Sequence, residues 1–176
     1  MAATFDEIGT VTADGTTTAI EVTGIDQTYD DLQVIFEYFI DDSSNPYTAY
    51  VSVNGDTATS TYNSDTMIGE GSGSYTYQED YNSYAGWRIL NCPSNSGSGT
   101  PYYWGNTIID MMQYTATRQK SFIARHCTFN SVGTNSAIGA AGLGYRNTAA
   151  ISSIKFSASA NIGSGSTITV YGIKNS

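Results

Sequence analysis

Basic residues are scarce in this sequence and absent from its first half. Only 7 of the 176 residues are lysine or arginine, against 16 aspartates and glutamates, and the formal net charge is −9 at pH 7. Proteins that bind nucleic acids need clustered lysines and arginines to contact the phosphates. The composition therefore argues against a nucleic-acid partner.

Long hydrophobic runs are also lacking. No stretch reaches the roughly 18 apolar residues that a membrane-spanning helix needs. The N-terminus, MAATFDEIG, has neither the basic region nor the apolar region of a secretion signal. We therefore expect a soluble protein that is assembled in a cytoplasm and does not insert into a membrane.

Residues that commonly carry catalysis or bind metals are few. His126 is the only histidine and no nucleophile motif exists, so we interpret it as a structural residue. Cys92 and Cys127 are the only cysteines and form no CxxC motif. We expect two buried free thiols, because assembly in a cytoplasm disfavours a disulfide between them.

Two pairs of adjacent acids, Asp30-Asp31 and Asp41-Asp42, flank the longest apolar run. Paired carboxylates can serve glycoside hydrolysis, and loop carboxylates can bind calcium. Solvated loop acids explain both pairs more simply, because no calcium-loop spacing accompanies them. The sequence thus predicts no catalytic residue, no metal site and no cofactor.

What the sequence does contain is typical of an all-β protein. Glycine (18) and tyrosine (14) are abundant, whereas lysine and glutamate, which favour exposed helices, are scarce. A chain of this length forms one domain with a proper core. We predict a single antiparallel β-sandwich over residues 1–176, jelly-roll-like, with about nine to ten strands.

The strand pattern is clearest near the C-terminus. Residues 150–157 and 166–173 alternate apolar and polar residues and are separated by glycines, which predicts a hairpin whose last strand lies inside a sheet. A second hairpin is predicted around the turn ADGT at residues 13–16. Residues 32–40 predict a central strand. The expected core includes Ile35, Phe36, Ile154, Phe156, Ile168 and Val170.

Three further segments of the second half predict strands. Residues 102–110 fit either a helix with a capping box or a strand, and we favour the strand. Residues 121–129 alternate, which places His126 on the face opposite Arg125 and Cys127. Residues 137–145 form a glycine-rich strand whose small side chains let another backbone come close.

The acidic residues are concentrated at the start of the chain. Of the 16 acids, 15 precede Arg88, the first basic residue. Residues 1–87 thus carry a formal charge of −15, and residues 88–176, with seven basic residues and one acid, carry +6. Either the two halves interleave in one sandwich, or the molecule has an acidic face and a less acidic face, suited to contacts with like subunits or with a basic shell.

A long insertion rich in tyrosine, serine and glycine spans about residues 57–104. Residues 57–86 show little apolar periodicity, which predicts a long loop that is functional or ordered by a neighbour. Tyrosine and tryptophan supply large, rigid contact areas, so a neighbouring subunit is the favoured partner and a glycan the alternative. The candidate interaction residues are Tyr75, Tyr77, Tyr81, Tyr84, Trp87, Tyr102, Tyr103 and Trp104.

Several short motifs occur in a fixed order along the chain. They are IDQTYDDLQV (residues 25–34), VNGD (53–56), residues 109–122 with Tyr114 and Lys120-Ser121, NTAAISSI (147–154), Asn161-Ile162, and residues 165–173 with their Tyr-Gly-Ile ending. This ordered set resembles a family of tailed-phage virion proteins common among marine phages. In that family a proline usually stands where this chain has Asp26.

The resemblance implies a non-enzymatic β-sandwich on the virion exterior, assembled in the host cytoplasm. The function it suggests first is a capsid decoration or cement subunit that contacts the major capsid protein or other virion proteins. The alternative is a tail or fibre module that recognises a host-surface glycan, and a glycan-cleaving tail enzyme is a third hypothesis. We expect self-association, with a trimer as the assumed oligomer.

Overall fold

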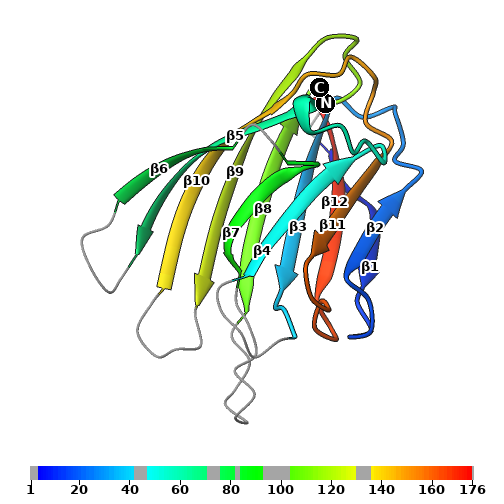
Figure 1. Cartoon of the computed structure of the whole chain (residues 1–176). Coiled ribbons are helices and arrows are strands. Elements are labelled where there is room, and N and C mark those ends of the chain that lie inside the picture. The colour runs from blue at the N-terminus through cyan, green and yellow to red at the C-terminus, as the bar shows by residue number, and fades with distance from the viewer. Residues whose placement is uncertain are drawn as a thin grey trace.

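The computed structural model describes residues 4–41, 47–70, 76–81, 84–92, 104–129 and 136–175 (Figure 1). In this part of the chain there are twelve strands and one short 3-10 turn, Thr59–Thr61. No helix among these residues is long and apolar enough to cross a membrane. The predicted all-β fold is therefore confirmed, with more strands than the nine to ten expected.

The strands form two antiparallel sheets. The larger sheet contains, in spatial order, β1 (Thr4–Thr12), β12 (Thr167–Lys174), β3 (Asp31–Tyr38), β8 (Gly105–Met112), β9 (Lys120–Phe129), β10 (Ser136–Tyr145), β5 (Tyr62–Glu70) and β6 (Thr76–Tyr81). The smaller sheet contains β2 (Ala19–Thr23), β11 (Ser153–Ala158), β4 (Tyr47–Val53) and β7 (Trp87–Cys92). Residues 105–112 thus form a strand, as favoured, rather than a helix.

Eight of the strands are connected as a jelly roll. Their orders, β1-β12-β3-β8 and β2-β11-β4-β7, send most successive connections from one sheet to the other. Two hairpins are inserted into this frame, β5–β6 between β4 and β7, and β9–β10 between β8 and β11. Both extend the larger sheet beyond β8, and Figure 1 shows β10, β5 and β6 reaching out on the left beyond the smaller sheet.

Both predicted hairpins are wrong for the same reason. β1 and β2 lie in different sheets, and so do β11 and β12. The turns have the expected glycines, Gly15 at φ +88° and Gly165 at φ +89°, but they join the sheets instead of adjacent strands. The two turns bind each other, because Gly165 N donates to Ala13 O at 2.9 Å. β12 does lie inside the larger sheet, between β1 and β3, as predicted.

The core lies between the two sheets. Phe36, Ile154, Phe156, Ile168 and Val170 are fully buried, which confirms five of the six predicted core residues. The ring of Phe156 packs against Phe36 and Tyr38, with centroid distances of 5.3 and 4.8 Å. The sixth residue, Ile35, is half-buried on the outer face, since neighbours along a strand point to opposite sides.

The stretch predicted as a long loop, residues 57–86, contains β5 and β6 instead. The inward residues of β5 are Tyr62, Ser64, Thr66 and Ile68, all buried. Two of these four are small and polar, so the period-two apolar pattern that marks a strand is hidden in the sequence. β5 and β6 are the main part of the insertion into the jelly roll.

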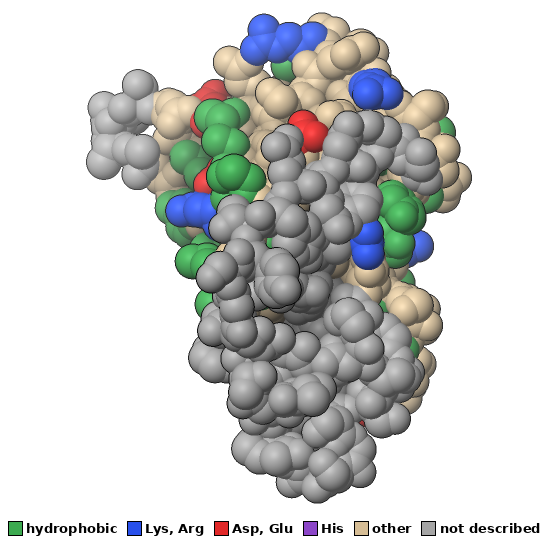
Figure 2. All heavy atoms as spheres, turned by 60° about the vertical axis from the view of Figure 1, so that its left-hand side comes forward, with side chains coloured by type: hydrophobic (Ala, Val, Ile, Leu, Met, Phe, Trp, Pro, Cys, Tyr) green, Lys and Arg blue, Asp and Glu red, His purple; other side chains and the backbone are tan. Residues whose placement is uncertain are grey.

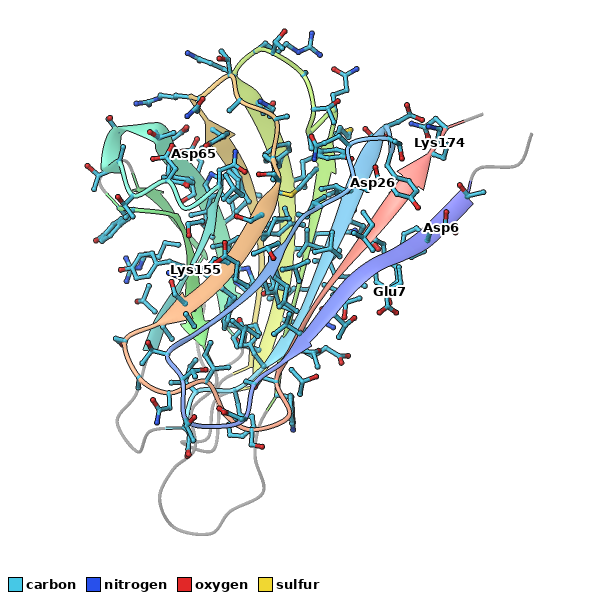
Figure 3. All side chains as sticks on the ribbon, turned by 90° about the vertical axis from the view of Figure 1, so that its right-hand side faces the viewer. Asp6, Glu7, Asp26, Asp65, Lys155 and Lys174 are labelled. Atoms are coloured by element: carbon cyan, nitrogen blue, oxygen red, sulfur yellow. The ribbon has the colours of Figure 1, made fainter. Side chains whose placement is uncertain are left out.

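The acidic first half interleaves with the second half. In the larger sheet β1, β3, β5 and β6 come from the first half, and β12, β8, β9 and β10 from the second, in mixed order. Figure 3 shows Lys174 at the same end of the sandwich as Asp6 and Asp26. The interleaved arrangement, the first of the two hypotheses on charge, is the one adopted.

Phe156→Ala should lower the free energy of unfolding by about 3–5 kcal/mol, because it leaves a cavity between the sheets. Denaturant unfolding measures this loss. Lys155→Ala changes the neighbouring outward position of the same strand and should stay within about 0.5 kcal/mol of the parent. A loss below about 1 kcal/mol for Phe156→Ala would contradict the central role of this ring.

Candidate functional site

Four loops meet at one end of the sandwich, which we call the loop end. They are residues 24–30, 54–61, 113–119 and 146–152. Backbone hydrogen bonds join them, from Ile25 N to Ser152 O (3.0 Å) and from Ile151 N to Tyr114 O (3.1 Å). Each loop carries part of one of the motifs that resemble phage virion proteins. The remaining motif residues, 161–162 and 165–173, lie in the connection to β12 and in β12 itself.

Asn54 binds the irregular segment that precedes β11. Its Nδ2 donates to Ala150 O at 2.8 Å, and its Oδ1 accepts from Ser152 N at 2.7 Å. Its backbone has φ +57°, a conformation that asparagine tolerates better than most residues. The side chain of Asn54 thus replaces the strand partner that this segment lacks.

Gln27 and Tyr114 tie two more loops to the same segment. Gln27 Nε2 donates to Ile25 O at 2.7 Å and to Ile151 O at 2.9 Å. The buried Tyr114 hydroxyl donates to Asp26 O. The motif residues at the loop end therefore hold backbone in place rather than pointing into solvent.

Asp26 fixes the turn that follows it. Its Oδ1 accepts a hydrogen bond from Thr28 N at 2.9 Å. An aspartate that binds the backbone two residues on forms an Asx turn. A side-chain hydrogen bond therefore holds this part of the loop end.

Lys120 is a buried cation at the start of β9. Its Nζ donates to Ala149 O at 2.8 Å and to Arg118 O at 3.1 Å, and lies 5.9 Å from the centre of the Tyr145 ring. Burial lowers the pKa of this amine. Because its bonds go to loop carbonyls, we interpret Lys120 as a further tie within the loop end.

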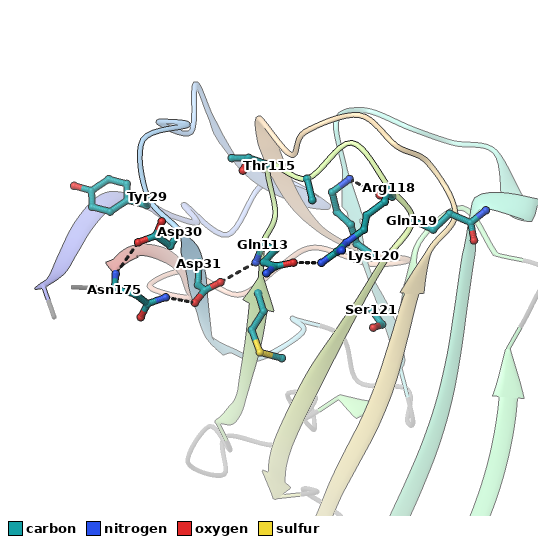
Figure 4. A pocket seen from close by; sticks show the side chains of 12 residues that line it. Tyr29, Asp30, Asp31, Gln113, Thr115, Arg118, Gln119, Lys120, Ser121 and Asn175 are labelled. Atoms are coloured by element: carbon teal, nitrogen blue, oxygen red, sulfur yellow. Dashed lines mark hydrogen bonds between the residues drawn. The ribbon is translucent and has the colours of Figure 1, made fainter.

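A polar cavity of about 900 Å³ opens at the loop end (Figure 4). Asp31 accepts from Gln113 N at 2.8 Å and from Asn175 Nδ2 at 2.9 Å, and Asp30 accepts from Asn175 N at 2.7 Å. The rest of the polar lining includes Tyr29, Thr115, Arg118, Gln119, Lys120 and Ser121. Such a set suits hydrogen bonding to a polar ligand.

The two acid pairs do not form one site. Asp30 and Asp31 lie at the loop end, whereas Asp41 follows the opposite end of β3, where its N donates to Asn161 O at 2.8 Å. Asp42 lies outside the described residues. Within the described ranges no three His, Cys, Asp or Glu side chains come together as a metal site.

A second candidate lies on the outer face of the larger sheet. We call it the outer patch: Met67, Ile108, Ile123, Cys127, Ile138 and Ala140, on β5, β8, β9 and β10. Ile138, Met67 and Ile123 are 68%, 61% and 50% exposed. All of these residues except Ile123 line a hollow of about 560 Å³. Arg125, which pairs with Asp110 at 2.8 Å, lies among them, between Ala140 and Ile108 in the strand register. Figure 2 turns this side of the molecule forward and shows hydrophobic side chains gathered beside charged ones at its left margin.

The inner face of the same strands carries small and polar side chains beside large apolar ones such as Ile68 and Phe122. Ser64, Thr66, Thr128 and His126 are buried there, and among the described residues Ser64 Oγ, Thr66 Oγ1 and His126 Nε2 have no hydrogen-bond partner. Burial lowers the pKa of His126. The imidazole lies over Gly139, where a Cβ would come within 2.1 Å of it.

The residues around His126 partly follow the prediction. His126 is interior, and Arg125 and Cys127 point to the opposite face, as expected. Cys127 is a free thiol, but it is exposed instead of buried. The prediction failed because free cysteines are usually buried, whereas the alternation of this strand places Cys127 on its outward face. The side chain of Cys92 lies outside the described residues.

The eight aromatic residues predicted to form an interaction surface lie in different environments. Trp87 is buried, with Nε1 donating to Gly144 O at 2.8 Å. Tyr84 is 36% exposed and packs on Tyr50, and Trp104 is 46% exposed and meets Phe39 edge-on. Tyr77 and Tyr81 lie in β6, of which the backbone alone is described, and Tyr75, Tyr102 and Tyr103 lie outside the described residues.

Sequence reasoning missed the outer patch. Met67, Ile108 and Ile123 each stand next to a large apolar residue that points inward, and Ile138 stands between Ala137 and Gly139, so no amphipathic pattern stands out. The available signal was the alternation in residues 121–129, where Ile123 and Cys127 share a face opposite His126. If that face had been interpreted as the outer one, the exposed apolar cluster would have been predicted.

Comparison with known proteins assigns the chain to no family. No protein-family model matches the sequence, and no curated protein matches it. The resemblance to phage virion proteins therefore rests on the motifs themselves. The function has to be argued from the geometry of the loop end and the outer patch.

Asn54→Ala should lower the free energy of unfolding by about 2–3 kcal/mol, because two hydrogen bonds are lost and alanine is strained at positive φ. Asn54→Gly removes the strain and should lose about 1 kcal/mol less. Denaturant unfolding measures both. The exposed Asn106→Ala is the matched control, and equal stability of Asn54→Ala and Asn106→Ala would show that the loop end is not held this way.

His126 should make stability depend on pH. The folded chain keeps the imidazole neutral, while the unfolded chain binds a proton below about pH 6.5, so stability is lost as the pH falls through that value. The unfolding free energy measured between about pH 7.5 and pH 5 should fall more steeply for the parent than for His126→Gln. Parallel profiles would contradict the neutral, buried histidine.

Proposed function

We propose that this chain is a non-enzymatic structural protein of a bacteriophage virion, a decoration or cement subunit on the outer shell. The observation that carries the proposal is the meeting of separate motifs at the loop end. Residues 25–34, 53–56, 109–122 and 147–154 are far apart in sequence, and their side chains bind one another's backbone there. Unrelated chance matches have no reason to converge in this way.

A structural role agrees with how the polar residues are used. Asn54, Gln27 and Lys120 make hydrogen bonds to backbone carbonyls, and Asp31 accepts two hydrogen bonds. In the described ranges the acids and the histidine do not meet as a nucleophile with its base or as a metal site. The motif residues therefore stabilise the fold, and the exposed faces of the sandwich are available for contacts with other proteins.

The surface supports assembly. Exposed contiguous apolar side chains on a folded domain mark interaction sites, and the outer patch is such a site for contacts between subunits. A net charge of −9 favours partners that are less acidic, such as a basic shell. The major capsid protein is the partner we propose for the decoration subunit.

A tail or fibre module that binds a host-surface glycan is the second candidate. The cavity of Figure 4 favours it, because Asp30 and Asn175 offer planar hydrogen-bonding groups near Tyr29, and Arg118 and Gln119 offer others farther along the lining. Cavities that place a few polar groups around a ligand are the usual form of small-molecule sites. Arg118→Ala would weaken such binding and leave decoration of a shell unchanged.

Purified phage particles test the proposal. A decoration subunit should be present in numbers comparable to the major capsid protein and should give density on the head in cryo-EM reconstructions. Particles from a deletion strain should lack that density and regain it when the purified chain is added. A few copies at the tail would support the glycan-binding module instead, and absence from the particle would contradict both.

A further inference from the structure

Large apolar residues lie on both faces of one part of the larger sheet. A sheet with one face packed on a core normally carries apolar residues inside and polar residues outside. On β5, β9 and β10 the large apolar residues Met67, Ile123 and Ile138 point outward. The inward residues of the same strands include Ile68 and Phe122 beside the polar Thr66 and His126. The pattern is typical of a sheet whose outer face is also covered.

We propose that a second copy of this chain covers the outer patch, packing sheet against sheet. Such an interface is isologous, because each copy contributes the same surface. Two sheets that pack face to face lie about 10 Å apart. The outward residues at the centre of β10, Ala140 and Gly142, are small, and nothing lies within 4 Å of the Cβ position of Gly142. A second sheet can therefore come close there.

The charges on this face permit a like partner despite the net charge of the chain. The chain is strongly acidic, so a contact between copies must avoid unpaired carboxylates. Asp110 beside the patch already binds Arg125 at 2.8 Å and Gln33 Nε2 at 2.8 Å. Among the side chains that the structure describes, the nearest other acids on this face are Asp65 and Glu37, which lie at opposite corners of the patch by strand register. Arg125, which lies between Ala140 and Ile108, is neutralised by Asp110.

The area suits a modest interface. Four strands of eight to ten residues make a face of roughly 19 Å by 30 Å, or about 600 Å² per copy. A stable interface buries about 800 Å² per partner, so this contact belongs near the weak end of the range. It would be most effective where many copies are held together, which is the setting of the proposed function. The contact itself is testable on the purified chain.

Sedimentation velocity of the full chain, from about 1 μM to about 1 mM, tests the inference. The parent should sediment faster as concentration rises. Ile138→Glu places a carboxylate within each patch and should weaken the association at least about tenfold. Ser159→Glu adds the same charge on an exposed loop and should match the parent, as should Ile138→Leu.

Labelling of Cys127 gives a second readout that needs no change in the patch. In a Cys92→Ser background, a maleimide should react with Cys127 more slowly as protein concentration rises. A monomer at every concentration, or equal association of Ile138→Glu and the parent, would overturn the inference. Association of the purified chain without its presence in particles would remove the virion role and leave this contact standing.

Discussion

The backbone of the buried Ile151 must be hydrogen-bonded without a neighbouring strand, and the loop end depends on how this is done. Ile151 is fully buried, so its polar backbone atoms need partners within the protein. Tyr114 O accepts from its N–H, and Gln27 donates to its carbonyl. The carbonyls of Ala149 and Ala150 accept from Lys120 and Asn54. Residues from all three other loops thus form hydrogen bonds with this one irregular segment.

This requirement explains why the motifs are separate in sequence and polar in character. A buried carbonyl without a donor costs about 1–3 kcal/mol, so each donor side chain stabilises the loop that carries it as well as the segment it binds. Residues such as Asn54, Gln27 and Lys120 would look catalytic if they were judged by type alone. Their hydrogen-bond partners are backbone carbonyls, which identifies these residues as structural. A binding function is therefore expected on the faces of the sandwich.

The features that follow from alternating polarity along a strand could be predicted from the sequence. The features that depend on which segments pair in space could not. The core positions of Phe36, Phe156 and Val170 follow from period-two patterns, as do the two faces of β9. A turn glycine such as Gly165 fixes where the chain reverses but not whether the next strand pairs or crosses to the other sheet. β5 was hidden because Ser64 and Thr66 occupy inward positions, and the convergence at the loop end required the fold.

The outward apolar residues of β5, β9 and β10 set this part of the larger sheet apart from the rest. Around β3 and β12, large side chains such as Phe36 and Ile168 fill the space between the sheets. On the inner face of β9 and β10, Phe122 and Leu143 join the same core, but Ala124 and Ala141 are small, and His126 Nε2 has no hydrogen-bond partner among the described residues. A small inward side chain buries less apolar area than a large one. Covering the apolar outer face would therefore add burial to the part of the sheet where the inner face contributes less.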